Sequence, residues 1–501
     1  MSSKSTGTMW AQRFQQHAGT GLSLQGKIRQ MLVSAILDEQ LPQGEALPSS
    51  RELSAQLGVA RNTVVLAYQQ LVDEGYLLAR ERSGFFVNPE ILGTRVASAP
   101  AVSTPARDGA PDWERRFVFR PSLQRHIVKR ANWRDYAYPF VYGQYDPALF
   151  PTADWRECCL KALSVLDIHD WAQDMFLRDD ESLVQQIRTR VLPRRGVWAS
   201  ADEIVVTVGA QQALYLLADL LVSPDTPVGI EDPGYPDARN IFASHTSLLL
   251  PQPVDDHGLM LTDALRACDY LYVTPSHQCP TTVTMPLERR QALLAQAEEG
   301  DFVLIEDDYE SESRFEGDPT PTLKSLDRNN RVIYVGSLSK SLAPGLRIGY
   351  IVGPAPLIAE LRGVRRLMLR HPSAYIQRAF ALFLSLGHYD AHLRRINTAW
   401  RERSQAVAEA LEKYLPGFRM VPIQGGASCW VEGPPWLDAG ALAQLAERQG
   451  VLIEPGSVFF MAEPAPRHVF RLGYASIPLA RIEPGIRTLA EVVREMEAST
   501  F

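Results

Sequence analysis

The chain has 501 residues, of which 46% are hydrophobic and 22% are charged, an ordinary balance for a globular protein large enough for several domains. Its net charge of −7 excludes a globally basic nucleic-acid-binding protein, so any DNA contact must come from a local surface. No apolar run reaches the roughly 18 residues of a membrane-spanning helix, and the N-terminus lacks the apolar core of a signal peptide. The five cysteines have no metal-ligand spacing, which predicts no metal site. We expect a cytoplasmic protein without a membrane segment.

The first patterned segment, residues 21–88, predicts three helices. Residues 24–41 carry apolar side chains at helical spacing. Ser49 and Glu52 form a capping-box signature at the start of the second helix, and Gly58 is expected to end it. The third helix is expected to begin at Arg61. Its apolar face would consist of Val64, Ala67, Tyr68 and Leu71.

Two short strands, 76–80 and 85–87, are expected after these helices and would be joined by a polar turn. Helices followed by such a β-ribbon are typical of a winged helix-turn-helix, whose recognition helix enters the DNA major groove. The candidate DNA contacts are Ser50, Arg51, Arg61, Asn62, Thr63, Tyr68, Arg80, Arg82 and Gly84. The segment is not basic overall, and an α+β dimerisation module would show the same pattern.

The sequence L-P-S-S-R-E-L-S-A-Q-L-G-V, followed by R-N-T-V and E-G-Y-L, resembles the GntR-type DNA-binding domain. The resemblance implies that residues 21–88 bind a double-stranded DNA operator. Ala60 stands where that family often has serine, so a hydroxyl contact to DNA or a helix cap is expected to be missing. Residues 89–112, rich in Ala, Pro, Ser and Thr, predict a flexible linker. The second domain would then span residues 113–501.

The second domain alternates helical patterns with short apolar runs. Strands are expected at residues 203–208, 228–230, 270–273, 302–305, 332–335 and 349–352. This alternation predicts an α/β domain with a mostly parallel sheet. Ligands of such sheets bind at the carboxyl ends of the strands, where the most informative motifs occur.

One of these motifs follows the strand at 332–335 and reads G-S-L-S-K-S-L-A-P-G-L-R-I-G-Y, from Gly336 to Tyr350. Lys340 stands there between a buried strand and a Gly/Pro turn. Burial of an ammonium is costly, and a lysine that forms an imine with an aldehyde avoids that cost. A surface lysine in a serine-rich loop is the alternative interpretation.

This stretch resembles the lysine motif of the fold-type I pyridoxal-phosphate enzymes, the aspartate aminotransferase superfamily. The resemblance implies that Lys340 holds pyridoxal 5'-phosphate (PLP) as a Schiff base and that Ser337 and Arg347 bind its phosphate. Ala210 and Gln211 begin an expected helix, and their backbone N–H groups would complete the phosphate site.

Further motifs resemble the remaining parts of that cofactor site. Tyr235, in E-D-P-G-Y-P, would stack on the cofactor ring. In E-D-D-Y, Asp307 would pair with the ring nitrogen, with Asp308 as the alternative, and Tyr309 would reach the ring hydroxyl. Arg471, in F-R-L-G-Y-A, would bind the carboxylate of a ligand, to which a planar guanidinium is suited.

Two departures from the aminotransferase pattern favour sensing over catalysis. Cys279 stands where aminotransferases have an asparagine that contacts the ring oxygen, and His277 or Gln278 would have to replace that contact. Residues 175–183 lack the tyrosine and glycine that form the phosphate contact shared between subunits.

Together the two halves resemble the MocR subfamily of bacterial transcription regulators. The resemblance implies a homodimer whose large domain senses an amino-group ligand by aldimine exchange at Lys340 and thereby changes DNA binding. An active aminotransferase with a DNA-binding head and a sensor of PLP itself are the alternatives. The effector stays open among GABA, taurine, ectoine-derived amino acids and D-alanine-type ligands, as does the direction of control.

Overall fold

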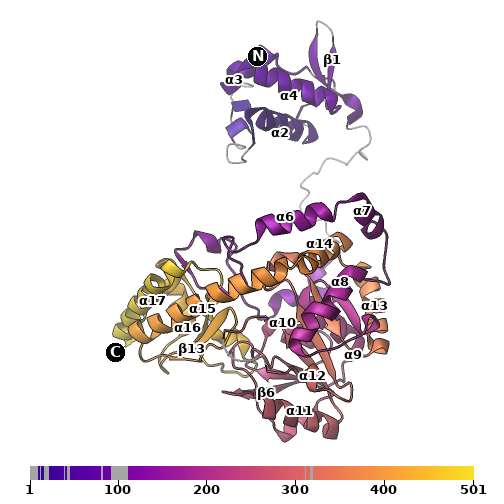
Figure 1. Cartoon of the computed structure of the whole chain (residues 1–501). Coiled ribbons are helices and arrows are strands. Elements are labelled where there is room, and N and C mark those ends of the chain that lie inside the picture. Colours follow the sequence, from indigo (N-terminus) through magenta and orange to yellow (C-terminus); the bar gives the residue numbers. More distant parts are fainter. Residues whose placement is uncertain are drawn as a thin grey trace. The chain divides into compact units, whose positions relative to one another are not determined.

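The computed structural model describes residues 10–11, 13–15, 22–38, 40–41, 44, 46–80, 83–91, 111–310, 312–315 and 320–500. The chain forms two compact units, Met1–Arg116 and Phe117–Phe501 (Figure 1). Arg82 and residues 92–110 of the expected linker lie outside the described residues. No helix among the described residues has both the length and the apolar character needed to cross a bilayer.

The smaller unit contains the predicted helices and β-ribbon. Its elements are α2 (Leu24–Leu37), α3 (Ser50–Leu57), α4 (Arg61–Asp73), β1 (Leu77–Arg80) and β2 (Gly84–Val87), the strands pairing antiparallel. The capping box is confirmed, because the Glu52 N–H donates to Ser49 Oγ at 3.2 Å and the Ser49 N–H donates to Glu52 Oε2 at 2.8 Å. Gly58 ends α3 with a φ of 65°, in the left-handed region that glycine tolerates.

The apolar faces of α2, α3 and α4 meet in one core, together with residues of both strands. Tyr68 belongs to this core, and its prediction as a DNA contact is wrong. Its side chain has no exposed surface, and its hydroxyl donates to the Pro48 carbonyl at 2.8 Å. The ring therefore anchors the segment before α3 onto α4 instead of reaching DNA.

Helix α4 begins without a side-chain cap, because Ala60 occupies the N-cap position. Replacing Ala60 with serine is expected to stabilise α4 by about 1 kcal/mol, since the new hydroxyl can accept a hydrogen bond from a first-turn N–H. Amide hydrogen exchange across residues 61–73 of the full chain should slow roughly fivefold. Ala55→Ser, at an exposed position within α3, is the control and should leave exchange in α4 unchanged. Unchanged exchange in Ala60→Ser would contradict the prediction.

The larger unit is built on an eight-stranded sheet with the order β4-β11-β10-β9-β8-β5-β6-β7. Its strands are β4 (Ile204–Thr207), β5 (Val228–Asp232), β6 (Leu249–Asp255), β7 (Gly258–Leu259), β8 (Tyr270–Val273), β9 (Val303–Asp308), β10 (Val332–Ser337) and β11 (Gly349–Val352). Strands β6, β5, β8, β9 and β10 pair in parallel, which confirms the mostly parallel sheet. Strand β11 runs antiparallel to β10 and β4, so β4 ends at the same edge as the parallel strands.

Helices cover both faces of this sheet. Alternate strand residues pack against α9 (Gly209–Leu221), α10 (Pro236–Ala243) and α13 (Ala355–Leu369) on one face. The other face packs against α8 (Glu181–Gln186), α14 (Ala374–Ser385), α11 (Leu287–Gly300) and α12 (Leu323–Leu326). This layering leaves the carboxyl edge of the strands, where the motifs lie, free to form a ligand site.

A second, antiparallel sheet carries the C-terminal motif. Its strands, in spatial order, are β12 (Arg419–Met420), β13 (Ser428–Glu432), β16 (Val469–Gly473) and β15 (Glu454–Pro455). Helices α15 (His388–Tyr414) and α17 (Leu479–Thr500) pack side by side (Figure 1). The remaining α-helices and strands of the larger unit are α6 (Thr152–Lys161), α7 (Val165–Trp171), α16 (Ala439–Arg448), β3 (Tyr138–Pro139) and β14 (Val451–Leu452), whereas α5 (Trp113–Arg116) ends the smaller unit.

Candidate cofactor and effector site

The motifs at the carboxyl edge of the large sheet line one cavity of about 390 Å³. It is lined by Ile127, Lys129, Tyr142, Gly143, Ala210, Gln211, Tyr235, Asp237, Cys279, Asp307, Tyr309, Ser337, Ser339, Lys340, Pro344, Arg347 and Arg471. Eight of the predicted cofactor residues and the predicted ligand arginine are among them, and His277 is not. Residues of β9 and β10, of the segments that follow β4, β5 and β8, and of β16 in the second sheet therefore face a common space.

Lys340 follows β10 and reaches the cavity beside two aromatic rings. Its Nζ lies 4.5 Å from the ring centroid of Tyr142 and 4.7 Å from that of Tyr309. Glycine is required at Gly336, because a Cβ there would lie 2.3 Å from the Tyr350 ring. Burial lowers the pKa of Lys340, which increases the fraction of free amine that can attack a carbonyl carbon.

The two carboxylates at the end of β9 differ in their partners. Asp308 accepts hydrogen bonds from Arg195 Nε and the Tyr334 hydroxyl, both at 2.8 Å. Burial opposes ionisation of Asp308, but the Arg195 guanidinium outweighs it and holds the pKa below its usual value. Asp308 is thus held in an internal ion pair and does not line the Lys340 cavity, although its buried Oδ1 has no hydrogen-bond partner among the described residues. Sequence alone left it as an alternative ring partner.

Asp307, unlike Asp308, lines the Lys340 cavity and has an unpaired oxygen there. Its Oδ2 accepts from the Tyr272 hydroxyl at 2.8 Å, whereas its buried Oδ1 has no hydrogen-bond partner among the described residues. Burial raises the pKa of Asp307 to about 6. A buried acceptor left unpaired is costly, so this oxygen is suited to a ligand N–H.

The start of α9 and the loop after Lys340 approach each other closely. A Cβ at Gly349 would lie 2.7 Å from the carbonyl carbon of Gly209, so the approach depends on glycine. Arg347 adopts a left-handed φ of 53°, which is uncommon for a residue with a side chain. Its Nη2 donates to the Val208 carbonyl at 3.1 Å, which holds the guanidinium at the N-terminus of α9.

An anion site results from this approach. Helix α9 has no side-chain cap, so the backbone N–H groups of Ala210 and Gln211 can bind an anion with the help of the helix dipole. Ser337 precedes Lys340 and Arg347 follows it, and both side chains line the same cavity as Ala210 and Gln211. Backbone donors, a hydroxyl and a guanidinium are the usual ligands of a phosphate group.

Arg471 lies on β16 opposite Glu454 of β15. Its Nε donates to Glu454 Oε2 at 2.8 Å, and its guanidinium lies 4.1 Å from the Tyr142 ring centroid and 4.8 Å from that of Phe459. Its buried Nη2 has no partner among the residues described. Arg471 therefore combines an internal ion pair with one donor nitrogen that a ligand can use.

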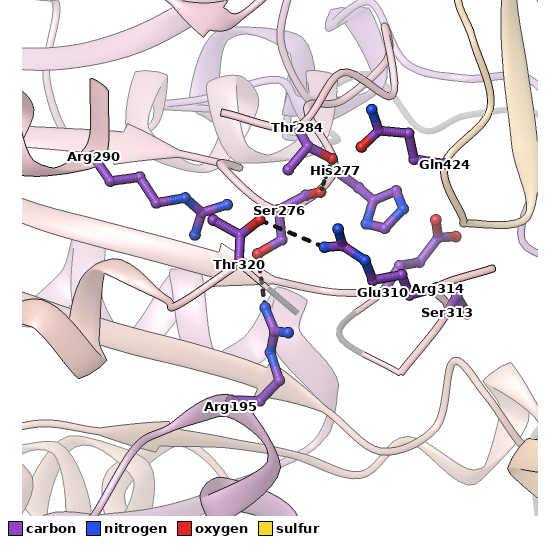
Figure 2. A pocket seen from close by; sticks show the side chains of 10 residues that line it. All are labelled: Arg195, Ser276, His277, Thr284, Arg290, Glu310, Ser313, Arg314, Thr320 and Gln424. Atoms are coloured by element: carbon purple, nitrogen blue, oxygen red, sulfur yellow. Dashed lines mark hydrogen bonds between the residues drawn. The ribbon is translucent and has the colours of Figure 1, made fainter. Parts of the chain in front are cut away.

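His277 lies in a different cavity, shown in Figure 2, beside Glu310, Arg314 and Gln424. Burial lowers its pKa, and neither ring nitrogen has a partner among the described residues. The Gln278 amide, in contrast, is already used within the protein, because its Nε2 donates to the Pro233 carbonyl at 2.8 Å. The prediction that His277 contacts the cofactor is therefore corrected, since His277 lines this second cavity and not the Lys340 cavity.

Five cavity residues lie outside every motif of the sequence: Ile127, Lys129, Tyr142, Gly143 and Asp237. Tyr142 is held by its hydroxyl, which donates to Glu310 Oε1 at 2.7 Å. Cys279 does line the cavity, and burial raises the pKa of its thiol to about 12, so it is a neutral group there. In the part of the chain that the structure describes, no group of three His, Cys, Asp or Glu side chains could hold a metal ion.

The described candidate DNA contacts of the smaller unit, Tyr68 apart, lie on its helix starts and on the β-ribbon. Arg51, Arg61 and Asn62 are exposed, Ser50 and Thr63 are half-buried, and Arg61 Nε donates to Ser50 Oγ at 3.3 Å. In the ribbon, Arg80 pairs with Gly84, and its guanidinium lies 4.5 Å from the Phe86 ring centroid. Exposed donors at the start of a helix can reach phosphates or base edges.

Comparison with known proteins divides the chain in the same way. Residues 24–87 match the bacterial regulatory proteins of the gntR family, and residues 181–489 match aminotransferase class I and II. The HTH-type transcriptional regulator TauR of Rhodobacter capsulatus is 44% identical over 473 residues, which cover 94% of this chain and 97% of TauR. The probable rhizopine catabolism regulatory protein MocR of Rhizobium meliloti is 32% identical over 94% of each chain.

The fold of the larger unit is shared with solved enzymes. The crystal structure of Pyrococcus horikoshii kynurenine aminotransferase, in complex with PMP, matches with a TM-score of 0.69 and 28% identity. The matched region covers 77% of this chain and 98% of the enzyme. The similarity to named regulators thus extends over both units, whereas the similarity to this enzyme covers about three quarters of the chain.

Proposed function

Because this chain belongs to the MocR-type GntR transcription regulators, with a GntR unit and an aminotransferase-like unit, we propose that PLP on Lys340 makes it a sensor of amines. When bound, the cofactor supplies an aldehyde carbon that a primary amine can hold and a ring that withdraws electrons. The observation that carries the proposal is the unpaired Asp307 Oδ1, in the same cavity as Lys340 and the anion site of α9.

The residues of the cavity fit the cofactor from end to end. Asp307 would accept the ring N–H, and the anion site would bind the phosphate through Ser337, Arg347 and the N–H groups of Ala210 and Gln211. Tyr235 would pack against the ring, and Tyr309 would donate to the ring hydroxyl. An effector amine would compete with Lys340 for the same carbon, and Arg471 would bind the acid group of that effector through Nη2.

The regulator is favoured over the aminotransferase with a DNA-binding head, because relatives covering both units are named transcription regulators. We propose a homodimer in the cytoplasm whose two GntR units bind two half-sites of a DNA operator. The effector can change DNA binding only if it favours one conformation of the protein over another.

Lys340→Ala tests this function. The purified protein is expected to show the visible absorbance band of a lysine-bound cofactor, and the variant is expected to lack it. In the wild type, an effective primary amine should shift DNA affinity, which is measured by fluorescence anisotropy on the promoter DNA of neighbouring genes. The variant should lose that response because its cofactor is no longer displaced from a lysine.

The control is Lys161→Ala, which removes an exposed lysine of α6 and should leave the band and the response intact. An amine response that survives in Lys340→Ala would overturn the proposal. DNA affinity that responds to PLP alone would instead favour a sensor of the cofactor, and sustained amino transfer to a keto acid would favour the enzyme.

A further inference from the structure

Lys129 is a cation of the Lys340 cavity that no sequence motif identifies. It precedes β3, and its Nζ lies 5.9 Å from the Tyr142 ring centroid. It also lies 2.9 Å from the position that a Cβ at Gly143 would occupy, so the lysine packs directly on that backbone. Among the described residues, no hydrogen bond or ion pair is formed by its ammonium group.

Three cations therefore surround one tyrosine ring. Lys340 and Arg471 lie 4.5 and 4.1 Å from the Tyr142 ring centroid, and Lys129 lies on the same ring at 5.9 Å. The ring itself is fixed, since its hydroxyl donates to Glu310 at 2.7 Å. This arrangement places positive charge around one side of the cavity.

The acids near Lys129 do not compensate it by direct contact. Glu454 is paired with Arg471 at 2.8 Å, and Asp237 accepts from the Tyr235 hydroxyl at 3.2 Å. Burial lowers the pKa of Lys129 to about 8, with attraction from Glu454 and Asp237 opposing it and repulsion from Lys340 and Arg471 adding to it. A bound anion would relieve that repulsion and keep the lysine charged.

The cofactor does not use this charge under the proposed function. Its phosphate is assigned to Arg347 and α9, its ring nitrogen to Asp307 and its aldehyde carbon to Lys340. Two donors are left over at the ligand end: the Lys129 ammonium and Arg471 Nη2. A ligand that carries only an amine would leave the buried Arg471 Nη2 without a partner, which is unfavourable, and would leave the solvent-exposed Lys129 ammonium unused.

We propose that Lys129 and Arg471 together bind the acid group of the effector, while the effector's amine occupies the position next to Lys340. The ligand class is a zwitterionic amino acid whose carboxylate or sulfonate is separated from a primary amine by a short carbon chain. Such an acid group has at least two acceptor oxygens, one for Arg471 Nη2 and one for the Lys129 ammonium. This inference rests on the proposed function and adds a specificity residue to it.

The test compares acidic and neutral amines on the PLP-loaded full chain. Spectral titration and calorimetry would measure the affinities for 3-aminopropanoate, 2-aminoethanesulfonate and propylamine. The wild type should bind at least one acidic probe more tightly than propylamine. Lys129→Met, which keeps the length of the side chain, should weaken that binding on the order of 10- to 100-fold and leave propylamine binding unchanged.

Lys129→Arg should restore most of the affinity, and Lys161→Met is the matched surface control. In the wild type, the advantage of the acidic probe over propylamine should fall as pH rises above about 8, whereas in Lys129→Arg it should persist. The inference is overturned if neither acid is preferred over propylamine, or if Lys129→Met leaves the preference intact. If the wild-type chain shows no visible band with PLP, the proposed function itself fails.

Discussion

Asp307→Asn is expected to weaken PLP binding by roughly 100- to 1000-fold. The asparagine keeps the shape of the side chain and can still accept from the Tyr272 hydroxyl, but it removes the negative charge that would hold the ring N–H. Loss of one partner of a buried charged pair costs on the order of 3–5 kcal/mol, which corresponds to at least a hundredfold in affinity. Absorbance titration of the cofactor-free protein with PLP measures the effect.

The same variant should not lose stability without the cofactor. The folded pKa of Asp307, about 6, is raised above its usual value of 3.8 by burial. Such a group contributes fully to the free energy of unfolding below pH 3.8, and the contribution is lost as pH rises through 6. At pH 8 the ionised, half-paired carboxylate therefore lowers the stability of the cofactor-free fold, and a neutral asparagine relieves it.

The melting temperature of cofactor-free Asp307→Asn at pH 8 should therefore equal or exceed that of the wild type. Asp301→Asn is the matched control, because the Asp301 side chain is exposed and its backbone φ of 55° lies in the left-handed region, which asparagine tolerates. It should alter neither PLP affinity nor melting temperature. Unchanged PLP affinity in Asp307→Asn would show that the unpaired oxygen does not meet the cofactor.

The elements that sequence predicted well are those whose periodicity comes from a single packing face. The buried side chains of α4 are the predicted Val64, Ala67, Tyr68 and Leu71, because a helix against one core must repeat every 3.6 residues. Tyr68 was predicted both on this apolar face and as a DNA contact, and its burial agrees with the first prediction alone. Strand β6 was missed because it contains Pro251 and Pro253, and proline usually interrupts a strand. Proline is tolerated near the edge of a sheet, which is where β6 lies.

Site residues next to a strand end were predictable, and the choice between neighbours was not. Asp307 and Asp308 follow each other on β9, so they point to opposite faces, and only tertiary packing gives Arg195 to one of them. Sequence offered His277 as a substitute for a missing asparagine, but the fold of its turn decides where the ring points. Lys129 and Tyr142 enter the cavity from a segment without a motif, so nothing local marks them.

Arg195→Met is expected to destabilise the larger unit by about 3–5 kcal/mol. Arg195 and Asp308 are both buried, and Arg195 Nη2 also donates to Ser276 Oγ at 2.9 Å (Figure 2). Without the guanidinium, Asp308 keeps only the hydroxyls of Tyr334 and Ser276 as charge-stabilising partners, and an uncompensated buried carboxylate is costly. Urea unfolding of the cofactor-free protein at pH 8 measures the loss.

Two further comparisons separate this ion pair from the cofactor site. Adding Asp308→Asn to Arg195→Met removes the unpaired charge and should recover part of the lost stability, which a packing defect alone would not allow. At a temperature where Arg195→Met is still folded, its PLP affinity should fall much less than that of Asp307→Asn. One carboxylate of β9 then acts on stability and the other on cofactor binding. If Arg195→Met lost PLP as severely as Asp307→Asn while still folded, that division of roles between the two neighbours would be wrong.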